Sequence, residues 1–165
     1  MGKVNGKQKG NSFERVVANL LSDKFKVYLG KEKTFIRNPD SGSMLGGKNQ
    51  SRIETHLEEF QKFGDVLTPT TFRFSIECKS YKTPPSLNSI LKQEVKQWDT
   101  WLEQANQDSK NANRELLLII KYNNTEPFVV VDKYINEIKS ILSYKQYLCY
   151  TLKDFLTLTE EWYFQ

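Results

Sequence analysis

The chain has 165 residues, of which 38% are hydrophobic and 27% charged, which suits one globular domain with a core and is too short for two ordinary domains. No run approaches the ~20 apolar residues of a membrane span. The lysine-containing start lacks the apolar segment of a signal peptide, so we expect a cytoplasmic protein. Two cysteines, Cys78 and Cys149, stand at no metal-like spacing, which argues for buried, reduced thiols and against a disulfide framework or a zinc site.

Positive charge is concentrated in the first third of the chain. Residues 1–52 contain 11 basic and 4 acidic side chains, whereas residues 53–165 contain 13 and 16. A phosphate backbone is a common target of such a concentration, so DNA is a candidate partner, with a merely solvated surface as the alternative. We expect residues 1–10 to form a flexible basic arm, whose Lys7 and Lys9 would contact DNA. Residues 11–165 would form the single domain.

The first predicted elements are a helix, a short strand and a long loop. Apolar residues recur at the i, i+3, i+4 spacing of an amphipathic helix over residues 13–24, with Asn11 or Ser12 as its N-cap. Residues 33–37 predict a strand, and the segment "NPDSGSMLGGKNQS" that follows is rich in turn formers. Residues 52–62 predict an exposed helix.

The rest of the chain alternates between strands and helices. In order, the predicted elements are two strands turning at "PTT" (65–68 and 72–79), a helix (86–108), two buried apolar strands (115–122 and 127–132), a helix (133–143), a strand (147–151) and a closing helix (152–158). The overall order α-β-β-β-α-β-β-α predicts a single α/β domain with a mixed central β-sheet flanked by helices on both sides.

The strand predicted over 72–79 combines apolar residues that would enter the core with charged residues at its end. Its apolar residues, from Phe72 to Cys78, alternate with polar ones, so they would enter the core while Glu77 and Lys79 stand side by side on the other face. A solvated outer face would produce the same alternation.

Asp65 makes a chemical interpretation possible. An antiparallel turn between the two strands would bring Asp65 alongside Glu77, so that two carboxylates converge with the Lys79 ammonium nearby. Two such carboxylates repel unless a cation lies between them, and Mg2+ suits oxygen ligands together with substrate phosphate oxygens. Phosphodiester hydrolysis, with the metal acidifying the attacking water and the lysine orienting it, accounts for all three residues.

This pattern resembles the PD-(D/E)xK nuclease superfamily, with Asp65 followed by Glu77-Cys78-Lys79, although Gly64 stands where a proline usually precedes the aspartate. Glu14 on the first helix resembles the additional acid of such nucleases. The stretch "FIRNPDSGSMLGGK" resembles the R-x-P-x-SG loop of Holliday junction resolvases of archaeal and phage type. The resemblance covers roughly residues 9–122 and implies the restriction-endonuclease-like αβββαβ core.

The resemblance implies a Mg2+-dependent endonuclease that resolves four-way junctions in DNA recombination, with Mn2+ able to substitute. The implied metal ligands are Asp65, Glu77, the main-chain carbonyl of Cys78 and Glu14. Lys79 would orient the water, and the products would carry 5′-phosphate and 3′-hydroxyl ends. The loop would supply a catalytic hydroxyl from Ser41, which fits better than Ser43, and a phosphate cradle; its expected DNA contacts are Arg37, Ser43 and Lys48.

Several alternatives remain at this level. Glu14 lies three residues after Asn11, a capping-box spacing, and the glycine-rich loop could be a connection without a role. The enzyme could prefer another DNA substrate, as restriction, mismatch or replication-associated nucleases do, or the fold could bind DNA without cleaving it. His56 is expected on the surface, Trp98 in the core and Trp101 at an interface. Because a four-way junction has two-fold symmetry, we expect a homodimer, with interface candidates at 86–108 and 133–143.

Overall fold

The computed structural model describes residues 6–39, 60–61 and 63–165. A mixed sheet has the strand order β1-β3-β4-β5-β6-β8-β7, and β2 pairs with β3 off this path. In chain order the elements are α1 (Gly6–Leu29), β1 (Ile36–Arg37), β2 (Phe60–Gln61), β3 (Val66–Pro69), β4 (Phe74–Tyr81), α2 (Leu87–Leu91), α3 (Lys96–Ala112), β5 (Glu115–Tyr122), β6 (Phe128–Val131), β7 (Leu142–Tyr144), β8 (Tyr147–Thr151), α4 (Leu152–Phe155) and the 3-10 helix η3 (Glu160–Tyr163).

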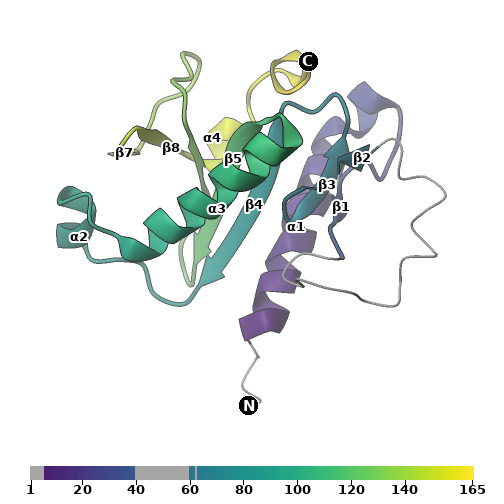
Figure 1. The fold of residues 1–165 in the computed structure, drawn as a ribbon. Coiled ribbons are helices and arrows are strands. Elements are labelled where there is room, and N and C mark those ends of the chain that lie inside the picture. The colour runs from purple at the N-terminus through teal and green to yellow at the C-terminus, as the bar shows by residue number, and fades with distance from the viewer. Residues whose placement is uncertain (1–5, 40–59, 62) are drawn as a thin grey trace.

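Helices cover both faces of the sheet, which confirms the predicted α/β class. Helix α3 crosses β4 and β5 on one face, while α1 lies beside β1, β3 and β4 (Figure 1). Strands β4 and β5 are parallel, and the other neighbouring pairs are antiparallel. The apolar run of β5 is buried on both sides: Leu118 packs in the α3 layer and Ile119 in the layer of α1 and α4.

Helix α1 is longer than the sequence predicted. It begins at Gly6, so Asn11 and Ser12 lie inside the helix and the predicted N-cap is wrong. Residues 6–10 of the expected arm are helical, and residues 1–5 lie outside the described chain. Fully buried Phe25 continues the apolar stripe beyond residue 24, which extends the helix because its packing face extends.

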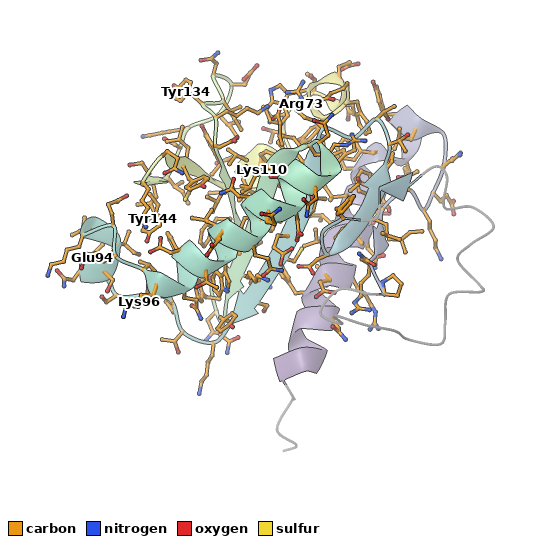
Figure 2. All side chains as sticks on the ribbon, viewed as in Figure 1. Arg73, Glu94, Lys96, Lys110, Tyr134 and Tyr144 are labelled. Atoms are coloured by element: carbon orange, nitrogen blue, oxygen red, sulfur yellow. The ribbon has the colours of Figure 1, made fainter. Side chains whose placement is uncertain are left out.

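The predicted helix over 86–108 is two helices. Ser86 caps α2 with its side chain, and Gln93 then adopts a left-handed φ of 59° before α3 begins. Contacts with β7 hold this break: the Val95 amide donates to the Tyr144 hydroxyl at 2.9 Å, and Gln93 Nε2 donates to the Ser143 carbonyl at 3.3 Å. Tyr144 lies beside this end of α3 (Figure 2). Tertiary hydrogen bonds therefore override the continuous apolar periodicity.

Two other predicted helices are wrong where the structure describes them. Residues 133–141 form turns and bends that lead into β7, because the Ile135 amide donates to the Tyr150 hydroxyl and the Ile141 amide to the Cys149 carbonyl. Residues 60–61 belong to β2, paired with β3. The remainder of the helix predicted at 52–62, including His56, lies outside the described residues.

The C-terminal segment closes the core beneath the β3–β4 turn. Phe164 forms a β-bridge with Phe72, and the Gln165 amide donates to the Thr71 carbonyl at 2.9 Å. Tyr163 is fully buried against Phe25. These contacts hold the turn that joins the two strands carrying the acidic residues. No helix among the described residues is long and apolar enough to cross a membrane.

Candidate active site

The register between β3 and β4 places Asp65 beside Glu77, as the sequence predicted. Val66 pairs with Ile76, and the Asp65 amide donates to the Ile76 carbonyl at 2.8 Å. Gly64, which precedes the aspartate, has a φ of 81°, and a Cβ there would lie 2.4 Å from the Ile76 carbonyl oxygen. The backbones approach so closely that only glycine fits, which explains its presence where the resemblance expects proline.

The Asp65 carboxylate is held by the backbone of the neighbouring strand. Its Oδ2 accepts a 2.8 Å hydrogen bond from the Cys78 amide, and Asp65 is 8% exposed. Burial raises the pKa of Asp65, and the negative charge of Glu14 adds to the rise, while the Cys78 amide and Lys79 oppose it. One carboxylate oxygen is thus fixed by the sheet.

Glu77 is the most deeply buried acid of the site. It is 2% exposed, and Lys79 Nζ donates to its Oε1 at 2.5 Å. Burial raises the pKa of Glu77 to about 8, and the charge of Asp65 contributes. The side chains of Glu77 and Asp65 also share a hydrogen bond. The charge of Asp65 therefore disfavours a charge on Glu77, and a cation between the two carboxyl groups would relieve this.

Lys79 lies between β4 and α3. Burial opposes its charge, but the attraction of Glu77 outweighs burial and raises the pKa of Lys79, so it is a cation at neutral pH. Its Nζ also donates to Gln104 Oε1 at 3.1 Å. Asp108, one turn further along α3, interacts electrostatically with both Lys79 and Glu77.

The sequence analysis missed Gln104 and Asp108. Both are polar residues at i, i+4 spacing, next to the buried Ala105 and Ser109 of α3. That pattern was a usable signal, because it places two polar side chains at the border of a helix face that packs on a strand.

Glu14 reaches the same region from α1. Arg37 Nε donates to Glu14 Oε2 at 2.7 Å, and Arg37 Nη2 donates to Asn11 Oδ1 at 2.9 Å. Both α1 residues lie inside the helix, so the capping-box alternative does not apply. Glu14 is 8% exposed and its charge acts on Asp65. The structure therefore brings Glu14, Asp65, Glu77 and Lys79 together.

The site fits a hard divalent cation. Burial and then the charge of Asp65 raise the pKa of Glu77, and Asp65 keeps one oxygen beyond its bond to Cys78. Among the described residues, no three acidic, His or Cys side chains already form a ligand shell. Mg2+ does not need one, because it keeps several waters and uses one or two carboxylates plus substrate phosphates.

The Cys78 side chain does not contribute to this site. It packs in the core, and burial raises the pKa of its thiol well above the usual value, so it remains neutral. Cys149 is also buried and free, as expected. Cys78 acts here through its amide, and ligation through its carbonyl stays a prediction.

Other sequence predictions fall beyond the site or outside the described residues. Ser41, Ser43 and Lys48 lie in the segment that the structure does not describe, and Lys7 and Lys9 lie in α1 at positions where only the backbone is described. Trp98 is buried, and its Nε1 donates to the Tyr122 hydroxyl at 2.7 Å, as expected of a core residue. Trp101 was predicted at an interface but is 5% exposed, because it packs from α3 against the sheet, beside Tyr81 of β4.

The fold and the site together define a nuclease domain of the PD-(D/E)xK class. The mixed sheet carries two acids at the β3–β4 pair, and a lysine stands two residues beyond the second acid. A further acid comes from the first helix. A family model described as "Phage putative PDDEXK endonuclease" matches residues 5–165. The chain belongs to this family. No curated protein and no solved structure matches it significantly.

Proposed function

We propose that the protein is a metal-dependent DNA endonuclease that hydrolyses phosphodiester bonds and resolves four-way junctions by paired nicks. The observation that carries the proposal is the convergence of the buried Asp65 and Glu77 carboxyl groups beside the Lys79 ammonium. This arrangement concentrates acidic oxygen ligands and one cation at a single point, as phosphoryl chemistry requires.

Each residue has a role that follows from its contacts. Asp65 and Glu77 would hold Mg2+, or Mn2+ in its place, with Glu14 completing the site. The cation would supply positive charge at the scissile phosphate and acidify the attacking water. Lys79, kept protonated by Glu77, would orient that water and stabilise negative charge developing on the phosphate. Arg37 positions Glu14 through their 2.7 Å ion pair.

The preference for four-way junctions rests on the resemblance of the loop "FIRNPDSGSMLGGK" to that of junction resolvases. Four-way, flap, nicked and plain duplex DNA, each incubated with the protein and Mg2+, test it directly. Symmetric paired nicks confined to the four-way substrate support a resolvase. Indifferent cutting of duplex DNA would instead identify a nuclease of another preference, such as a restriction, mismatch or replication-associated enzyme.

The Asp65→Asn variant tests the catalytic site. It removes a ligand charge without changing shape, so we expect cleavage to fall by at least about 100-fold. The Cys78 amide can still donate to the remaining carbonyl oxygen, so the variant should fold. Cleavage assays with Mg2+ and with Mn2+, alongside circular dichroism of the same preparation, measure both effects. Full activity of the folded variant would refute the site.

A non-catalytic DNA-binding protein on the same fold is the second candidate. The presence of both acids and the lysine in one cluster argues against it. Tight junction binding by the unaltered protein, with no cleavage in either metal ion, would favour it.

A further inference from the structure

We propose that a cavity between α1 and β1 is a second binding site for the phosphate backbone of the nucleic-acid substrate, separate from the acidic cluster. This inference rests on the proposed nuclease function. The cavity measures about 350 Å³ and is lined on its polar side by Arg15, Asn19, Lys33 and Arg37, over a floor that includes Ala18 and Phe35.

The charged side chains that line this cavity are all positive. Three of its lining side chains are cationic and none is acidic. Arg15 and Lys33 are exposed, and neither forms an ion pair with another residue that the structure describes. A concave surface on which Arg15 and Lys33 carry charges that no described acid neutralises attracts anions, and a guanidinium together with an ammonium matches phosphate oxygens well. Asn19 adds a neutral hydrogen-bonding group at the same place.

The walls of the cavity are rigid. Phe35 is 3% exposed and packs against Phe25 of α1 with ring centroids 5.5 Å apart. Ser22 of the same helix both donates to the Phe35 carbonyl and accepts from its amide, at 3.1 Å and 3.0 Å. These contacts clamp the segment that carries Lys33 onto the helix that carries Arg15, so the backbone positions of the two cations are set before any ligand arrives.

Arg37 connects the cavity to the acidic cluster. It lines the cavity while its Nε donates to Glu14, and its backbone pairs with Val66, the residue after Asp65. Arg15 directly follows Glu14 on α1. A strand whose scissile phosphate lies at Asp65 and Glu77 can therefore place another of its phosphates in the cavity. The cluster would then cut, and the cavity would bind and orient the strand.

The experiment compares two double variants of the full chain. Arg15→Ala/Lys33→Ala removes the two uncommitted cations of the cavity. Lys110→Ala/Lys153→Ala removes the same charge from exposed positions that lie outside the cavity and outside the predicted dimer interface. Binding of a labelled four-way junction and of a labelled duplex is measured in Ca2+, over a series of salt concentrations. Competition by inorganic phosphate separates recognition of the polymer from capture of a free anion.

We expect the cavity variant to bind DNA at least about tenfold more weakly and to lower the slope of log Kd against log salt by about two, since each phosphate contact contributes about 0.9. The control variant should keep the slope and affinity of the unaltered protein. The proposal is overturned if the cavity variant keeps the salt slope of the unaltered protein. It is also overturned if both variants lose the same affinity for DNA, which would mean that affinity follows net charge alone. Strong competition by millimolar inorganic phosphate would reassign the cavity to a free anion. If the unaltered protein neither binds nor cuts DNA, the proposed nuclease function fails instead.

Discussion

Glu77 combines near-complete burial with a pKa of about 8, against a usual 4.5. The folded state therefore holds this proton more tightly than the unfolded state. The resulting stabilisation is fully present below about pH 4.5 and is lost as pH rises through 8. Metal binding favours the charged carboxylate, so it should release protons near neutral pH and offset this loss.

The free energy of unfolding should therefore fall measurably with rising pH when EDTA keeps the protein free of metal ions. Between pH 6 and pH 8 we expect the free energy of unfolding to fall by on the order of 2 kcal/mol, at about 1.4 kcal/mol per pKa unit. Glu77→Gln cannot titrate, so its stability should change much less over the same range. Urea denaturation of both proteins at the two pH values tests this, and an equal fall in both would show that Glu77 is not the responsible group.

Gln104 is a positioning residue in the proposed mechanism, because its Oε1 accepts from Lys79 Nζ at 3.1 Å. Gln104→Ala should lower kcat about fivefold and leave KM for DNA nearly unchanged, since one hydrogen bond is worth about 1 kcal/mol. Gln107→Ala, on the exposed side of α3, is the matched control. Steady-state cleavage kinetics separate the two variants, and equal losses in both would point to a general effect on α3.

At the scale of the elements, the short β3–β4 pair determines the site. Gly64 permits the close approach of the two strands, and a Cβ there would meet the Ile76 carbonyl oxygen. Gly30 also has a positive φ, of 64°, but nothing lies within 4 Å of a Cβ placed on it. Substituting each glycine by alanine therefore measures two different costs: a left-handed backbone alone at Gly30, and a left-handed backbone together with a steric clash at Gly64.

We expect Gly64→Ala to destabilise the protein by about 3 kcal/mol and Gly30→Ala by about 1 kcal/mol, since both carry backbone strain and only the first adds a clash. Guanidinium denaturation of both variants measures this order. Gly64→Ala should also lose cleavage in the fraction that remains folded, because it displaces Asp65. Equal destabilisation by the two substitutions would mean that the strands separate readily at this point.

At the scale of the whole molecule, the homodimer expected from the sequence stays a prediction, and both predicted interface segments carry exposed apolar side chains. Leu87 and Leu91, at i, i+4 on α2, are each 70% exposed, and Tyr134 is 68% exposed. Surface area of this kind is costly to leave in water and suits a second copy of the chain.

Sedimentation velocity tests the dimer. We expect the unaltered protein to sediment as a dimer on a four-way junction, and Leu87→Ser/Leu91→Ser to weaken association by about tenfold or more, since each buried leucine contributes about 1.5–3 kcal/mol. Paired nicks should then give way to single nicks. A monomer both free and on the junction would exclude this architecture and leave a monomeric nuclease.

The sequence by itself predicted that Asp65, Glu77 and Lys79 lie together, because the relevant signals are local. Strand alternation places Glu77 and Lys79 on one face, and a short antiparallel turn suffices to bring Asp65 alongside. The apolar run of β5 predicted its bounds, 115–122, as the structure has them. These features depend on neighbours within about a dozen residues.

The tertiary structure alone decided what depends on contacts between distant segments. The break between α2 and α3 is held by Tyr144, about fifty residues away. The predicted helix at 133–143 is replaced by turns because Ile135 finds a partner in Tyr150. Gln104 meets Lys79 only because α3 packs across β4. Helical periodicity specifies which face of a segment is buried, whereas its partner across the sheet determines where the segment ends and which polar side chains meet.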